Sequence, residues 1–150
     1  MTSNRRGKLI NKMKISFPSF SVNEGFARAA VAAFCSQLNP TATDIADIKC
    51  AISEAVTNCI VHAYRDTIGE VYIIAELYEG SLVKLAVRDK GCGIADIQSA
   101  RRPLFTTDAE GERSGMGFTV MESFTDKMTV RSKVGKGTTV TMYKKMGLVL

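Results

Sequence analysis

Three polar side chains follow one another at four-residue intervals in a stretch with helical character: Glu54, Asn58 and His62. Each step of four residues advances roughly 40° around an α-helix, so the three would form one polar stripe beside an apolar one. Small residues such as Ala51 and Ala55 flank this stripe, where a solvated helix face usually carries lysine or glutamate. The pattern therefore favours a ligand close to this face over a plain solvent-exposed helix.

A second cluster, Asp89 with Gly91 and Gly93, directly follows a β-rich run. A carboxylate at a strand end can accept a hydrogen bond from an exocyclic amine such as that of adenine, while glycines let the backbone approach a ring closely. A tight turn is the structural alternative. A dinucleotide-binding fingerprint is excluded, because Asp96 takes the place of its third glycine and no helix follows.

Two further glycine-containing segments resemble phosphate-binding motifs. The run Ser114–Gly117 precedes a predicted helix, and backbone amides at a helix N-terminus form an anion site suited to polyphosphate. An ordinary helix start is the alternative interpretation. The run from Gly135 to Thr138 looks like the end of a P-loop, but strand-like residues follow it, so we interpret it as a hairpin turn with Thr138 turned inward. Ordinary protein kinases are excluded because their H-R-D and D-F-G motifs are absent.

The elements that position these residues are predicted from periodicity, caps and turns. Capping boxes at Ser21 with Glu24, and at Thr41 with Asp44, predict two helices, the second reaching about Tyr64. The apolar residues at helical spacing, predicted to be buried, include Phe26 and Phe34 on the first helix and Ile48, Ile52 and Val56 on the second. The predicted strands are 14–20, 71–78, 82–88, 127–133 and 138–144, with a long irregular segment over 89–115 and a last helix over 117–124. This order predicts an α+β two-layer sandwich, in which helices cover one face of a mostly antiparallel sheet.

Composition is that of one ordinary globular domain of 150 residues, without an apolar run long enough to cross a membrane. The formal charge is +5, but five of the twenty basic residues lie within residues 1–14, which leaves fifteen bases against fifteen acids. We therefore expect a disordered basic tail over 1–13, a domain over 14–145 and a short tail over 146–150, and no direct nucleic-acid partner. The four cysteines have no C-x-x-C spacing, which argues against zinc and for reduced thiols in the cytoplasm.

Read in order, S-E-A-V-T-N-C-I-V-H, D-K-G-C-G-I, S-G-M-G-F and G-K-G-T-T resemble the N, G1, G2 and G3 boxes of the GHKL (Bergerat) ATPases. The strings E-G-F-A-R, R-P-L-F-T-T and E-R-S-G-M-G sharpen the resemblance. Together they make residues 13–145 similar to the anti-sigma F family, the serine-kinase anti-sigma factors of spore-forming bacteria. The combination is far more specific than any single motif.

The resemblance implies a role for each matching position. Glu54 would be the general base and Arg113 would neutralise transferred charge, while a lid over about 95–116 would close on the nucleotide. Asn58 would hold Mg²⁺, and Arg28 would help to dock the sigma factor. The implied contacts to ATP come from Asn58, Asp89, Gly91, Gly93, Thr106, Thr107, Ser114, Gly115, Met116, Gly117 and Thr138.

By the same resemblance, the protein would bind a sporulation sigma factor of the sigma F type and keep it from RNA polymerase. It would also phosphorylate a serine of an anti-anti-sigma factor, and it would act as a homodimer. One alternative is the catalytic module of a histidine kinase, although the sole histidine, His62, already lies in the nucleotide helix. Another is a nucleotide-dependent binding module, against which Glu54 argues because a pure binder needs no base. The last is a sandwich domain whose glycines only make turns.

Overall fold

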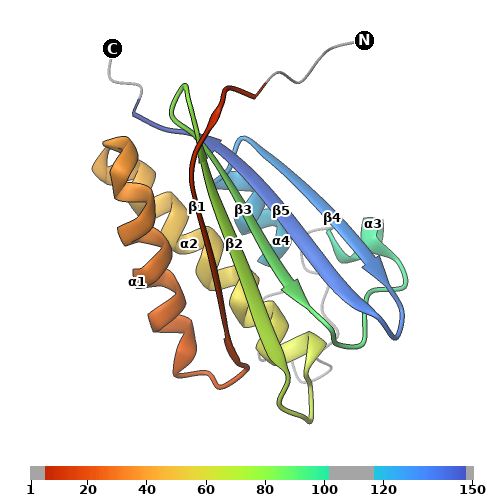
Figure 1. Ribbon diagram of the computed structural model, residues 1–150. Coiled ribbons are helices and arrows are strands. Elements are labelled where there is room, and N and C mark those ends of the chain that lie inside the picture. The colour runs from red at the N-terminus through yellow and green to blue at the C-terminus, as the bar shows by residue number, and fades with distance from the viewer. Residues whose placement is uncertain (1–5, 102–116, 148–150) are drawn as a thin grey trace.

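The computed structural model describes residues 6–101 and 117–147 (Figure 1). The elements in chain order are β1 (Leu9–Pro18), α1 (Asn23–Cys35), a 3₁₀ turn (Ser36–Leu38), α2 (Ala42–Asn58), a π-helical turn (Cys59–Ala63), β2 (Glu70–Tyr78), β3 (Leu82–Asp89), α3 (Ile97–Ala100), α4 (Gly117–Ser123), β4 (Lys127–Lys133) and β5 (Gly137–Lys145). In the described part, no helix is long and apolar enough to cross a membrane.

The strands form one sheet in the order β1-β2-β3-β5-β4, and every neighbouring pair is antiparallel. Figure 1 shows α1, α2 and α4 together on one face of this sheet. The other face carries no helix among the described residues. The predicted two-layer sandwich is therefore confirmed.

The core lies between the sheet and the helices. Alternate residues of β2 and β3 are buried, as a strand with one covered face requires, and they meet the apolar stripe of α2. On α2 this stripe includes Ile48, Ile52 and Val56, each with no exposed surface, as predicted. Its start is also as predicted, because the Thr41 hydroxyl accepts a hydrogen bond from the Asp44 amide at 3.0 Å and the Asp44 carboxylate accepts one from the Thr41 amide at 3.1 Å.

The prediction of a disordered tail over 1–13 is wrong for residues 9–13. β1 begins at Leu9 rather than Lys14 and pairs along the full length of β2, from Leu9 opposite Tyr78 to Pro18 opposite Glu70. Its lysines are compatible with a strand because β1 lies at the edge of the sheet and turns them to solvent.

The predicted cap of the first helix is also wrong. Helix α1 begins at Asn23, and Val22 at the capping position makes no side-chain hydrogen bond. The carboxylate of Glu24 accepts a hydrogen bond from Arg28 at 3.0 Å instead. The buried face of α1 includes Ala27 and is displaced from the predicted one, which included Phe26. Alanines at many positions make the apolar period of this helix ambiguous.

Candidate functional site

The second helix changes its geometry just where the predicted polar stripe ends. Glu54 and Asn58 lie in the α-helical part, both half-buried, whereas His62 lies in the π-helical turn. The Tyr64 amide donates to the Cys59 carbonyl at 2.9 Å, the i→i+5 bond that defines such a turn. The regular four-residue stripe therefore holds only from Glu54 to Asn58. Turns of this kind occur frequently at functional sites.

The wide turn leaves the Ala63 carbonyl as a docking point for the glycine-rich loop that follows β3. This carbonyl accepts a hydrogen bond from the Cys92 amide at 3.2 Å, and a Cβ on Gly91 would collide with it. On the other side, Gly93 has a φ of +76° and lies against the Lys133 carbonyl. The loop is thus held between the end of α2 and the β4–β5 turn, and the close approaches of its glycines are to protein backbone.

Asp89 connects these elements and is only 5% exposed. Its Oδ1 accepts hydrogen bonds from the backbone amides of Gly91 at 2.9 Å and Thr138 at 3.2 Å. Its Oδ2 accepts a weaker bond from the thiol of Cys59 at 3.6 Å. The carboxylate therefore has a fixed orientation, set by β5, by its own loop and by the residue that follows Asn58.

Burial raises the pKa of Asp89 above 3.8, while the hydrogen bonds from Gly91, Cys59 and Thr138 oppose that rise. Burial also raises the pKa of the Cys59 thiol, and the nearby carboxylate adds to the effect. The thiol therefore stays protonated and can donate. An ionised carboxylate offers about four acceptor positions, so Asp89 retains capacity for one more donor at Oδ2.

Two further residues hold the loop in place, and the sequence analysis did not identify them. The buried hydroxyl of Tyr64 donates to the Glu70 carbonyl and accepts from the Lys90 amide, both at 2.6 Å. The hydroxyl of Ser132 accepts from the Ile94 amide at 2.7 Å. Neither residue lies in a recognisable motif, and their contacts follow from the packing of the loop against the end of α2 and against β4.

The structure brings several of the predicted site residues together. Asn58 precedes Cys59, which contacts Asp89, and Thr138 stands opposite Asp89 in the sheet. Glu54 lies one helical turn before Asn58, and α4, which begins at Gly117, packs against α2.

Other predicted residues lie elsewhere or outside the described part. Arg28 is on α1, where it also donates to the Ser53 hydroxyl at 3.4 Å. The predicted lid is described only as far as Arg101 and forms the short helix α3. Outside the described residues are Thr106, Thr107, Arg113, Ser114, Gly115 and Met116.

The sequence matches the family described as "Histidine kinase-like ATPase domain" over residues 21–144. An anti-sigma F factor of Thermoanaerobacter sp. (strain X514) is 54% identical over 137 residues, which cover 91% of this chain and 95% of that protein. An anti-sigma F factor of Geobacillus thermodenitrificans is 52% identical over 134 residues, covering 89% of this chain and 92% of that protein.

Solved structures with a similar fold are more distant in sequence. The RsbU and RsbW domains of Rv1364c from Mycobacterium tuberculosis superpose with a TM-score of 0.67 at 21% identity, over 91% of this chain and 32% of that one. The catalytic domain of the histidine kinase ThkA superposes with a TM-score of 0.57 at 16% identity, over 91% of this chain and 97% of that one. At these identities the likeness concerns the fold alone.

Proposed function

Because the chain belongs to the anti-sigma F factor family and carries a histidine kinase-like ATPase domain, we propose that it is an ATP-dependent serine kinase and a sigma-factor antagonist. It would transfer the γ-phosphoryl group of ATP to a serine of an anti-anti-sigma factor. It would also bind a sporulation sigma factor of the sigma F type and keep it from RNA polymerase. A homodimer in the cytoplasm is the form in which we expect it to act.

The adenine end of the site is the part that the geometry supports best. Asp89 is buried, its Oδ1 is held by two backbone amides, and its Oδ2 can take one more donor. The exocyclic amine of adenine is such a donor. A fixed buried acceptor discriminates strongly between bases that have this amine and bases that lack it. In this proposal Thr138 lies beside the base, and Gly91 and Gly93 shape the loop next to it.

The phosphate end is assigned to the C-terminal part of α2 and to the start of α4. Mg²⁺ is usually bound through one or two protein oxygen ligands together with substrate phosphates, and the half-buried amide of Asn58 offers one such oxygen. When bound, the ion would neutralise charge on the phosphates. The amides of Ser114, Gly115, Met116 and Gly117 would hold the phosphates at the helix N-terminus.

Catalysis would then consist mainly of positioning and electrostatics. Glu54, one turn before Asn58, would take the proton of the serine hydroxyl of the anti-anti-sigma factor. The serine oxygen would attack the γ-phosphorus of ATP, and ADP would leave. Arg113 would neutralise charge on the transferred group, and Thr106 and Thr107 would contact the nucleotide from the lid.

Docking of the sigma factor is assigned to α1 around Arg28. The side chain of Arg28 is 45% exposed, and its guanidinium is held at 3.0 Å from Glu24, which is four residues earlier on the same helix. This pair presents a positioned cation on α1, and the same guanidinium donates to the Ser53 hydroxyl of α2 at 3.4 Å. An exposed pair of this kind contributes little to stability, so its charge is available for recognition.

The observation that carries this proposal is the contact between Asp89 and Cys59, the residue that follows Asn58 at the end of α2. The test is to incubate the protein with γ-labelled ATP, Mg²⁺ and a purified anti-anti-sigma factor. We expect label on a serine of that factor. Absence of label with wild-type protein that binds ATP would contradict the kinase assignment.

Two variants separate catalysis from binding in the same assay. Glu54→Ala should abolish transfer and leave ATP affinity unchanged, whereas Asn58→Ala should weaken both, because it removes the proposed metal ligand. Glu79→Ala, in the turn between β2 and β3, removes the same kind of side chain far from the site and is the matched control. Equal losses of ATP affinity in the Glu54 and Asn58 variants would contradict a catalytic role for Glu54.

A further inference from the structure

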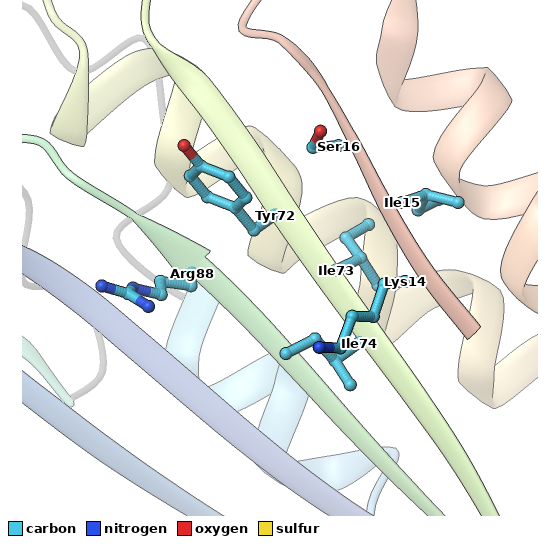
Figure 2. Close-up of a pocket in the computed structure, with 7 residues that line it drawn as sticks. All are labelled: Lys14, Ile15, Ser16, Tyr72, Ile73, Ile74 and Arg88. Atoms are coloured by element: carbon cyan, nitrogen blue, oxygen red, sulfur yellow. The ribbon is translucent and has the colours of Figure 1, made fainter. Parts of the chain in front are cut away.

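A row of three polar residues crosses the sheet beside the glycine-rich loop: Asp89 on β3, Thr138 on β5 and Ser132 on β4. Thr138 stands directly opposite both of the others in the strand register. Each of the three lies two residues along its strand from an apolar residue of the core, so their side chains point to the helical layer. Arg88, the neighbour of Asp89, points the other way, to a hollow that Tyr72 also lines on the opposite face (Figure 2). The row therefore lies on the side of the sheet where the proposed adenine site is.

The hydroxyl of Ser132 joins the end of this row to the loop. Its Oγ accepts a hydrogen bond from the Ile94 amide at 2.7 Å. The same oxygen lies 3.1 Å from the Gly137 carbonyl and 2.7 Å from Oγ1 of Thr138. A hydroxyl has one hydrogen to donate and two lone pairs with which to accept. Ser132 can therefore donate either to the carbonyl or to the threonine, and this choice sets the direction of the bond to Thr138.

Counting the hydroxyl hydrogens gives that direction. If Ser132 donates to the Gly137 carbonyl, Thr138 donates to Ser132, and both hydrogens have an acceptor. If Ser132 donates to Thr138 instead, the hydrogen of the buried Thr138 hydroxyl has no acceptor among the described residues. A buried donor without a partner is costly. The first arrangement is therefore favoured, and it leaves the lone pairs of Thr138 Oγ1 for a ligand.

We infer that Ser132 is a positioning residue for recognition of the base, because it takes the hydrogen of Thr138 and leaves Oγ1 as an acceptor beside Asp89. The Cβ atoms of directly opposite strand residues lie about 4.5–5.5 Å apart, so one amino group can lie between the two side chains. The amine of adenine has two hydrogens for these two acceptors, whereas the 6-oxo group of hypoxanthine or guanine has none and is repelled. This inference rests on the proposed function, which puts adenine against Asp89 and Thr138.

The test measures the affinities of the full-length protein for ATP and for inosine triphosphate (ITP), in which an oxo group replaces the amine, by calorimetric titration with Mg²⁺. Ser132→Ala frees the Thr138 hydroxyl to turn and donate, whereas Ser132→Thr keeps a hydroxyl on a residue that suits a strand. Ser36→Ala is the matched control, because it removes a hydroxyl that donates to the Ala32 carbonyl at the end of α1. Thermal melting establishes that each variant is folded.

We expect the preference for ATP over ITP to fall about 10-fold in Ser132→Ala. Ser132→Thr and the control should keep the wild-type preference. A loss of equal size for both nucleotides would mean that Ser132 only supports the loop, and it would overturn the inference. A wild type that binds ITP as tightly as ATP would also overturn it. A wild type that binds neither nucleotide would refute the proposed function itself, and the inference with it.

A second background tests whether Ser132 acts through Thr138. Thr138→Val keeps the shape of the side chain but has no hydroxyl to orient. In this background, Ser132→Ala should leave the preference for ATP over ITP unchanged, because the effects of two residues that act as one unit do not add. A further fall as large as that seen with Thr138 present would overturn the inference.

Discussion

Replacement of Asp89 by asparagine separates the chemistry of the site from the stability of the fold. The change keeps one side-chain oxygen, which can still accept the backbone bonds from Gly91 and Thr138. It replaces the other oxygen, which faces Cys59, with an amide group that only donates. Volume and shape are nearly unchanged, so any loss of function reports the lost acceptor and the lost charge.

Two opposite effects are expected from Asp89→Asn. A hydrogen bond to a charged group contributes about 1.5–3 kcal/mol, so ATP should bind about 10- to 150-fold more weakly when its amine meets a donor. Stability should move the other way. Burial raises the pKa of Asp89, so the folded protein binds this proton more tightly than the unfolded chain. The ionised carboxylate therefore costs stability at neutral pH, and that cost disappears as the pH falls through the folded-state pKa.

Calorimetric titration with ATP and Mg²⁺, together with thermal melting at pH 7 and at acid pH, measures both effects. We expect Asp89→Asn to melt at or above the wild-type temperature at pH 7, and the difference to shrink in acid. Asp66→Asn removes the same charge from an exposed position and is the control. The reasoning would be refuted if Asp89→Asn bound ATP as tightly as the wild type, or if its melting temperature at pH 7 were several degrees lower.

Further predictions concern packing and charge elsewhere in the fold. Gly91→Ala should lower the free energy of unfolding by about 1–3 kcal/mol in urea titrations, because its Cβ would collide with backbone. Gly25→Ala, in the first turn of α1, would bring its Cβ only to ordinary contact with Arg28 at 3.9 Å, so it should raise the free energy of unfolding by about 0.4–1 kcal/mol. Equal effects of the two substitutions would contradict this packing. Burial raises the pKa of Asp44, but hydrogen bonds from Gly147 and Thr41 and the charge of Lys144 outweigh it, so the pKa lies below 3.8. The stability from Asp44 is therefore present above about pH 4 and lost as the pH falls through the folded pKa. Lys144→Met leaves the Asp44 and Asp47 carboxylates without this cation, so it should destabilise the protein at pH 7 by about 1–3 kcal/mol and by less at pH 3. An equal loss at both pH values would contradict the pair.

Helix α2 could be predicted from the sequence because all of its local signals agree. A capping box begins it, and isoleucine and valine at helical spacing give it one clear apolar face. Helix α1 gave conflicting signals, since alanines fill both of its faces. The start of β1 could not be predicted either, because its first four residues are all exposed and show no alternation of buried and exposed positions; only their pairing with β2 identifies them as strand.

The candidate site was predictable where it rests on motifs and not where it rests on tertiary contacts. Asn58 and Asp89 stand out by type and spacing, and the fold brings their neighbourhoods together. The π-helical turn and the bridging hydroxyl of Tyr64 depend on how the loop after β3 packs against α2.

The central claim is that Asp89, Asn58 and the helix start at Gly117 surround one nucleotide. A crystal structure with a non-hydrolysable ATP analogue and Mg²⁺ tests this directly. The account predicts the adenine amine within about 3.2 Å of Asp89 Oδ2, the Asn58 side-chain oxygen on the metal ion, and the phosphates at the N-terminus of α4. A nucleotide bound on another surface, or an adenine amine that contacts no oxygen of Asp89, would contradict it.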